Sequence, residues 1–147
     1  MDTLDRVVSR LRASFESTKQ MPLDADLYAS NLHVGHNYDP GRTVEVSLFL
    51  SNVAKELAAA KKVGASDHRE LTRFLVADDT VVATVLNTGR LGDGTSTRFY
   101  IAYFFKIADG RIVDIETWYD RKGSEEQARA IAKEMEMPPL GGPKTNP

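Results

Sequence analysis

The segment from residue 70 to residue 120 most constrains the fold, because it follows the two-residue period of β-strands and short turns interrupt it. Acidic residues and glycines mark those turns, at positions 78–79, 92–94 and 109–110. The pattern predicts an antiparallel meander of strands over residues 70–77, 80–90, 97–107 and 111–120. Helices from elsewhere in the chain must cover one face of such a sheet.

The first 41 residues predict two helices and one short strand. Apolar residues from Leu4 to Phe15 recur at helical spacing and form a single stripe. A short second helix is expected over residues 24–28. Residues 32–37 are expected to form a strand, which a turn at residues 39–41 closes.

A longer helix is predicted after that turn. Thr43 is its expected N-cap, Glu45 suits the positive end of the helix dipole, and Gly64 marks its end. After the meander, a capping box that starts at Ser124 predicts a last short helix. The chain therefore predicts an α+β fold in which helices pack on a curved antiparallel sheet.

Composition limits the function classes that this chain can serve. Its 147 residues suit a single domain over residues 1–136, and the Pro- and Gly-rich residues 137–147 are expected to be a disordered tail. A net charge of −2 excludes a polycation that binds nucleic acid through charge alone, so no nucleic-acid partner is expected. The absence of cysteine excludes disulfides, thiolate zinc sites and thiol nucleophiles.

Targeting and membrane-spanning segments are not expected. Charges recur every few residues near the N-terminus, which does not fit the apolar region of a signal peptide. The longest apolar runs are far shorter than the ~20 residues that cross a bilayer. A cytoplasmic protein without a membrane partner is the expectation.

The order of these elements and the sequence FFKIADGRIVDIETWYD at residues 104–120 resemble the nuclear-transport-factor-2-like (NTF2-like) superfamily. Residues 4–120 are most similar to its branch of SnoaL-like polyketide cyclases and ketosteroid isomerases. The resemblance implies a cystatin-like cone, in which a curved antiparallel sheet wraps around N-terminal helices and leaves a pocket at its wide end. Because the superfamily includes isomerases, cyclases, dehydratases, epoxide hydrolases and non-enzymes, the resemblance predicts the fold more closely than the reaction.

The resemblance also implies candidate catalytic residues. Steroid isomerases of this fold keep a carboxylate base in the strand after the second helix, and residues 27–41 match that segment with His36 at the position of the base. Tyr103 occupies the position of their protonated aspartate, and no tyrosine occupies their oxyanion-binding position near residues 13–15. An acidic position of the epoxide hydrolases is Thr117 here. SnoaL-type cyclases, which use a single His or Asp, therefore fit best, with His36 and Tyr103 as the catalytic pair.

His36 suits acid–base chemistry, because an imidazole titrates near neutral pH and can take a proton from carbon next to a carbonyl. Tyr103 is placed to donate a hydrogen bond to the enolate oxygen that develops. The alternative is that His36 lies at the rim of a pocket and bonds a backbone carbonyl. A metal site of His33, His36 and Asp39 is not expected, because the two histidines diverge on a strand.

Strand alternation, together with the apolar face of the long helix, predicts the side chains that line the pocket. The predicted set is Val34, Phe49, Val53, Val82, Thr84, Leu86, Thr88, Ile101, Phe105, Ile115, Thr117 and Tyr119. These side chains are mainly apolar and carry a few hydroxyls, which suits a small apolar, oxygen-bearing molecule. The same residue types also fill cores, so a packed cone without a ligand is the alternative.

The opposite face of the sheet is expected to carry Tyr100, Phe104 and Trp118. Large aromatic side chains gathered on one exposed sheet face are typical of an interface, and a homodimer through this face is predicted.

Two functions remain open from the sequence. The first is a cofactor-free enzyme that isomerises, cyclises or dehydrates a small apolar carbonyl compound by acid–base chemistry. The second is a non-catalytic module that binds a small ligand or forms a dimer. An enzyme requires a base and a donor that converge on one substrate, whereas a binder does not.

Overall fold

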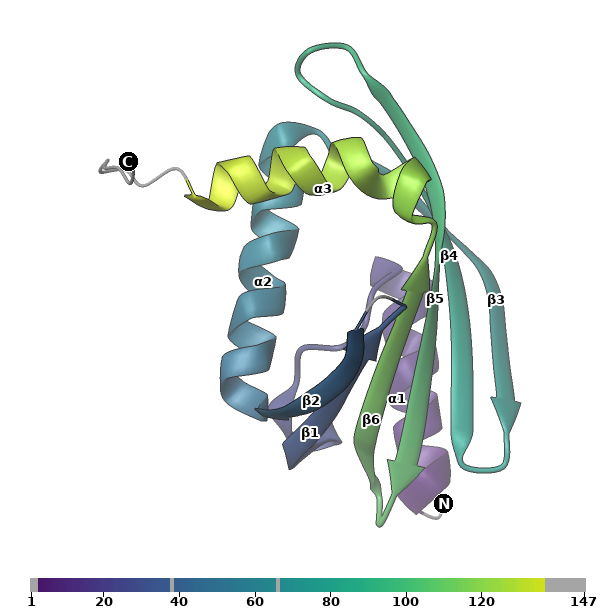
Figure 1. Ribbon diagram of the computed structural model, residues 1–147. Helices are drawn as coiled ribbons and strands as arrows, with labels where there is room; N and C mark the ends of the chain where they lie inside the picture. Colours follow the sequence, from purple (N-terminus) through teal and green to yellow (C-terminus); the bar gives the residue numbers. More distant parts are fainter. Residues whose placement is uncertain (1–2, 38, 66, 137–147) are drawn as a thin grey trace.

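The computed structural model describes residues 3–37, 39–65 and 67–136 of the chain and has the α+β architecture that the sequence predicts (Figure 1). The helices are α1 (Thr3–Thr18), the short 3₁₀ helix η1 (Ala25–Leu27), α2 (Val46–Val63) and α3 (Arg121–Glu136). The strands are β1 (Tyr28–His36), β2 (Asp39–Glu45), β3 (His68–Ala77), β4 (Thr80–Arg90), β5 (Ser96–Ala108) and β6 (Arg111–Tyr119). The expected tail, residues 137–147, lies outside the described residues.

All six strands form one sheet in the order β2-β1-β6-β5-β4-β3. Strands β3 to β6 form the predicted antiparallel meander. Strand β1 instead pairs in parallel with β6, and β2 pairs antiparallel with β1, so the complete sheet is mixed. The parallel pairing places the segment after α1 beside the last strand of the chain (Figure 1).

Strand β2 was not expected, because its Pro40-Gly41 sequence is typical of a turn. It is an edge strand, where proline is tolerated because no further strand needs its missing N–H group. Gly41 has φ +98°, and a Cβ there would lie 2.6 Å from the Val34 carbonyl oxygen. Glycine is therefore required where β2 lies against β1. Strand β1 also begins earlier than predicted, at Tyr28, and leaves only one short turn of helix before it.

The caps of α2 and α3 differ from those expected. The Glu45 carboxylate caps α2 by accepting from the N–H groups of Ser47 and Leu48, at 2.9 and 3.0 Å, whereas Thr43 lies inside β2. Helix α3 begins at Arg121, because the Asp120 carboxylate accepts from the Lys122 and Gly123 N–H groups. The end of α2 at Gly64, with φ 80°, is as predicted.

Helix α1 supplies the middle of the hydrophobic core. Val7, Leu11 and Phe15 are fully buried against the inner face of the sheet. Complete burial of each such side chain is worth about 1.5–3 kcal/mol. Phe105, which was predicted to line the pocket, is fully buried in this core, with its ring 5.8 Å from that of Phe15.

Among the described residues, no helix combines the length and the apolar composition that a membrane crossing requires.

Tyr28 ties the start of β1 to the segment after α1, and its removal tests that connection. The buried Tyr28 hydroxyl donates to the Pro22 carbonyl at 2.5 Å, and burial raises the pKa of this phenol above its usual range. Tyr28→Phe leaves that carbonyl without its donor, so we expect the free energy of unfolding to fall by about 1–2 kcal/mol in urea denaturation. Tyr100→Phe, at an exposed position, is the control and should change it by less than about 0.5 kcal/mol. Equal effects of the two changes would contradict this role of Tyr28.

Candidate active site

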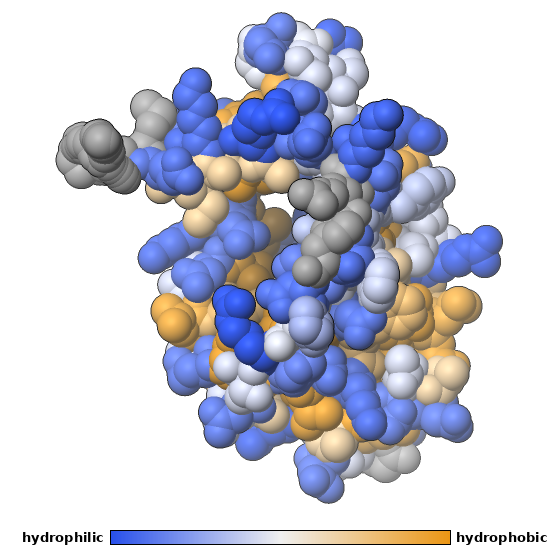
Figure 2. Space-filling model, viewed as in Figure 1, coloured by the Kyte–Doolittle hydropathy of each residue, from blue (hydrophilic) through white to orange (hydrophobic). Residues whose placement is uncertain are grey.

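A cavity of about 660 Å³ lies between the inner face of the sheet and helices α2 and α3. Strand ends of β1, β5 and β6 form one wall, α2 forms the opposite wall, and α3 crosses between them (Figure 1). Figure 2 shows orange, hydrophobic side chains inside the hollow and blue, hydrophilic side chains around its rim. The volume is that of a pocket for a small molecule.

The inner face of the sheet is core at one end and cavity wall at the other. Along β5, Phe105 and Ile107 belong to the core, whereas Phe99, Ile101 and Tyr103 line the cavity. The predicted site residues that the structure places in the cavity wall are His36, Tyr103, Val34, Phe49, Val53, Ile101, Ile115, Thr117 and Tyr119.

The prediction for β4 is wrong. Val82, Thr84, Leu86 and Thr88 lie on the outer face of the sheet, because they pair directly with outward-facing residues of β5 such as Phe104 and Tyr100. Directly paired antiparallel residues point to the same side of a sheet. The inward residues of β4 are Val81, Ala83, Val85 and Asn87, all of which are buried.

His36 and Tyr103 reach the same cavity from strands that are not neighbours. His36 pairs with Thr117 across β1 and β6, and Thr117 pairs with Tyr103 across β6 and β5. Two strand spacings separate the backbones of His36 and Tyr103, which is roughly 10 Å. Between these two side chains, Thr117 forms the wall of the cavity.

Arg69 of β3 supports Tyr103. Its Nη2 atom donates to the Tyr103 hydroxyl oxygen at 3.0 Å. Because that oxygen acts as the acceptor, the phenolic proton is available for a second hydrogen bond to another group. A guanidinium donor also strengthens the tyrosine as a donor, since hydrogen bonds in a chain polarise one another.

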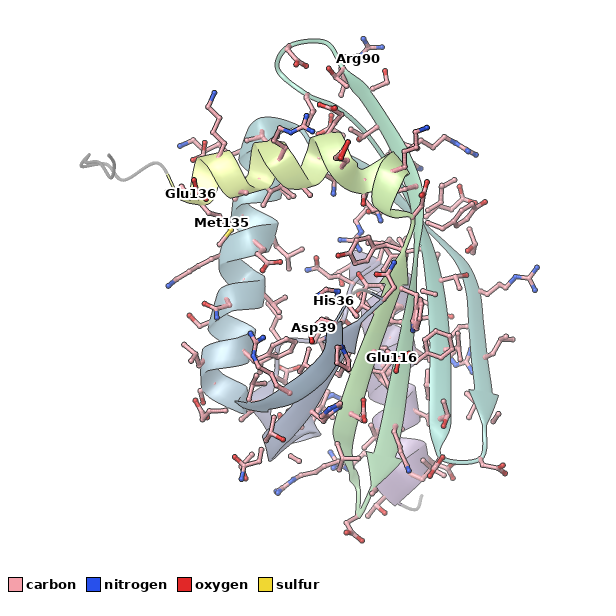
Figure 3. The ribbon with its side chains drawn as sticks, in the orientation of Figure 1. His36, Asp39, Arg90, Glu116, Met135 and Glu136 are labelled. Atoms are coloured by element: carbon pink, nitrogen blue, oxygen red, sulfur yellow. The ribbon has the colours of Figure 1, made fainter. Side chains whose placement is uncertain are left out.

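Asp39 lies beside His36 at the junction of β1 and β2 (Figure 3). Its Oδ2 atom is 3.9 Å from His36 Nε2 and 3.8 Å from Arg42 Nη1, and its Oδ1 accepts from the Gly41 N–H group. His33 points to the opposite face of the sheet, as predicted, where its Nδ1 lies 3.2 Å from Asp114. The described residues contain no cluster of three metal-ligating side chains.

Several polar groups of the cavity were not predicted from the sequence. Glu56 follows Phe49 and Val53 on one face of α2, so its place could have been read from helical spacing. Arg69 lies near the start of β3, two residues before the bulge between Leu71 and Arg73, and no local pattern marks its direction. Helix α3 starts directly after β6 and crosses to α2, so its inner side lines the cavity. The capping box at Ser124 predicted a helix here but did not indicate the direction in which it runs. The lining residues of α3 are Ser124, Gln127, Ala128, Ile131, Ala132 and Met135.

The outer face of the sheet exposes the aromatic side chains that were expected there. Tyr100 is 51% exposed, Trp118 is 47% exposed and Phe104 is 36% exposed. Leu75 of β3, at 54%, extends this apolar area toward the edge of the sheet. The right side of Figure 2 shows hydrophobic side chains over these strands.

Comparisons with known proteins identify the fold. No protein-family profile and no curated protein matches the chain. A steroid delta-isomerase from Pseudomonas aeruginosa superposes with a TM-score of 0.65 at 13% identity, over 92% of this chain and 93% of that one. An NTF2-like protein from Burkholderia thailandensis has a TM-score of 0.63 at 18% identity, over 87% and 98% of the two chains. The chain has the NTF2-like fold.

The NTF2-like fold agrees with the resemblance found in the sequence, and it leaves the chemistry open. An LEH-like epoxide hydrolase of Mycobacterium tuberculosis matches this fold with a TM-score of 0.54 at 12% identity, over 90% of this chain and 92% of that one. An isomerase and an epoxide hydrolase thus share the NTF2-like architecture with this chain. Function must therefore be argued from the polar groups of this cavity.

Glu56 provides a test of the electrostatics of the cavity. Partial removal of water from its carboxyl raises the pKa above the ordinary value of 4.5. Ionising Glu56 therefore costs more in the folded state than in the unfolded state, and this cost appears as the pH rises through the raised pKa. We expect Glu56→Gln to increase the free energy of unfolding at pH 8 by about 0.5 kcal/mol, because solvent still screens the group. At pH 4 the difference should vanish.

Urea denaturation at both pH values measures the effect of Glu56→Gln. A difference that is equal at pH 4 and pH 8 would contradict the raised pKa.

Proposed function

We propose that the protein is a cofactor-free enzyme that enolises a small, largely apolar carbonyl compound, as a SnoaL-like isomerase, cyclase or lyase would. The observation that carries the proposal is that His36 and Tyr103 line one cavity from either side of Thr117, with the Tyr103 proton available for a ligand. A base and a donor on opposite sides of a bound ketone are what enolisation requires.

The reaction begins with the carbonyl oxygen of the substrate against the Tyr103 hydroxyl. The neutral imidazole of His36 takes a proton from the carbon next to the carbonyl, and the electron pair of that C–H bond moves to form the enolate. Tyr103 donates a hydrogen bond to the enolate oxygen. The imidazolium then returns the proton to the same or another carbon, which leaves the enzyme unchanged.

Two charged neighbours support these steps. The Asp39 carboxylate, 3.9 Å from His36 Nε2, stabilises the imidazolium that proton removal creates. The Arg69 guanidinium, which donates to Tyr103, stabilises the negative charge that develops on the substrate oxygen. The apolar wall formed by Phe49, Val53 and Ile101 lowers the dielectric around Tyr103, so the effect of Arg69 is stronger than in water.

Hydrogen–deuterium exchange at carbon tests the proposal without knowledge of the natural substrate. Phenylacetone in D₂O exchanges its benzylic hydrogens through the enolate, and proton NMR follows the loss of signal. We expect the wild type to accelerate exchange over buffer, His36→Gln to reduce the enzymatic rate about 10²–10⁴-fold, and Tyr103→Phe to reduce it about 10²-fold.

The chain offers matched controls for both variants. His33→Gln changes a histidine of the same strand on the outer face, and Tyr100→Phe changes a tyrosine of β5 on that face. Both should exchange phenylacetone at the wild-type rate. If His36→Gln also retained that rate, His36 would not be the base.

We further propose that a second copy of the chain covers the outer face of the sheet. Leu75, Tyr100, Phe104 and Trp118 form an exposed apolar centre on this face. The exposed carboxylate of Glu116 lies beside Phe104, and Lys106 and Asp114 lie at one end of the face. A two-fold axis through the face would bury the apolar centre and allow opposite charges of the two copies to pair.

The oligomeric mass tests this interface. The wild type should sediment at micromolar concentration with twice the 16.3 kDa mass of one chain, and Phe104→Glu should sediment as a monomer because it places a charge in the apolar centre. Leu48→Glu, at a 62%-exposed position of α2, is the control and should remain dimeric. A monomeric wild type would disprove the interface.

A further inference from the structure

Arg69 gives the cavity a positive charge that no described carboxylate balances. Its guanidinium lines the cavity and donates to the neutral Tyr103 hydroxyl, and its Nε atom is buried without a hydrogen-bond acceptor. No ion pair of Arg69 is present among residues 3–37, 39–65 and 67–136. Charged groups in partly buried sites are normally paired, because removing them from water is costly.

The other charged groups of the cavity do not serve as its partner. Asp39 lies between His36 and Arg42, at 3.9 and 3.8 Å, so its charge is already engaged at the β1–β2 end of the cavity. Glu56 belongs to α2, on the wall opposite the sheet, and forms no ion pair with Arg69. The sheet wall beside Tyr103 therefore carries a net positive charge.

The two donors of this wall are adjacent. Arg69 Nη2 and Tyr103 Oη are 3.0 Å apart, so they present their remaining hydrogens to two neighbouring positions in the cavity. A ligand that accepts from both donors needs two neighbouring oxygens, one of which carries a negative charge for Arg69. A carboxylate next to a carbonyl group has such a pair of oxygens. Guanidinium groups bind carboxylates through charge-assisted hydrogen bonds, which are about twice as strong as neutral ones.

We propose that the cavity binds an apolar 2-oxo acid, whose carboxylate pairs with Arg69 and whose ketone oxygen accepts a hydrogen bond from Tyr103. The apolar body of the acid lies between α2 and the sheet, against Phe49, Val53 and Ile101. In this orientation the hydrogens next to the ketone face the side of the cavity that carries His36. The inference rests on the proposed function in that it uses the same cavity, but it concerns binding alone.

Affinities for two related probes test the inference. Phenylpyruvate is a 2-oxo acid, and phenylacetone is a neutral ketone with a methyl group in place of the carboxylate. By isothermal titration calorimetry at pH 7, we expect the wild type to bind phenylpyruvate at least about tenfold more tightly than phenylacetone. Arg69→Met should abolish this preference, so that its affinities for phenylpyruvate and phenylacetone differ by less than about twofold.

Further variants separate the charge of Arg69 from its effect on folding. Arg69→Lys keeps the charge and should retain part of the preference for phenylpyruvate. Arg73→Met removes an arginine of the same strand from the outer face and should retain all of it. Equal wild-type affinities for the two probes, binding of neither, or a full preference in Arg69→Met would overturn the inference.

The failure of this inference can be distinguished from the failure of the proposed function. His36→Gln should lose deuterium exchange but keep the preference for phenylpyruvate, because the carboxylate lies at Arg69. A protein that prefers phenylpyruvate and catalyses no exchange would be a binding protein for such acids, and the inference would stand. A protein that exchanges phenylacetone without any preference for the acid would retain the enzymatic function and overturn the inference.

Discussion

The pairing register of β4, β5 and β6 determines which side chains reach the cavity. Directly paired residues of antiparallel strands share a face, so the burial of Phe105 places its partners Val81 and Ile115 on the inner side as well. The same register sends Val82, Phe104 and Glu116 outward. A shift by one residue would exchange the cavity wall and the exposed aromatic face, so one set of backbone hydrogen bonds fixes both.

The sequence predicts the meander and the long helices well, because turn residues and apolar spacing act locally. The inward face of β5 and β6 was also predictable, since Lys106 marks the outer side. The face of β4 was not, because Val81 and Val85 on one side are as apolar as Val82 and Leu86 on the other. Only its register against β5 resolves the choice. Strand β2 depends on its edge position, which is a property of the sheet.

The candidate site was also only partly predictable, because the direction of some of its side chains depends on how distant segments pack. His36 and Tyr103 could be placed by resemblance to other proteins, but Arg69 and Glu56 face the cavity through the paths of β3 and α2. Steroid isomerase and epoxide hydrolase structures share the fold at low identity, which shows how little the backbone limits the chemistry. In this chain the cavity contains a guanidinium that donates to a tyrosine beside an apolar wall.

The parallel pairing of β1 with β6 has a consequence for the order of folding. Asn37, next to β1, donates to the carbonyl of Tyr119 in β6, across 82 positions of the chain. Contacts between such distant segments form late, because the loop that they close is entropically costly. During synthesis β1 emerges early, with β2 as its only neighbouring strand until β6 leaves the ribosome. A nascent chain that ends before β6 thus contains both His36 and Tyr103 but lacks the strand that lies between them, and the cavity is completed only when β6 and then α3 have been synthesised.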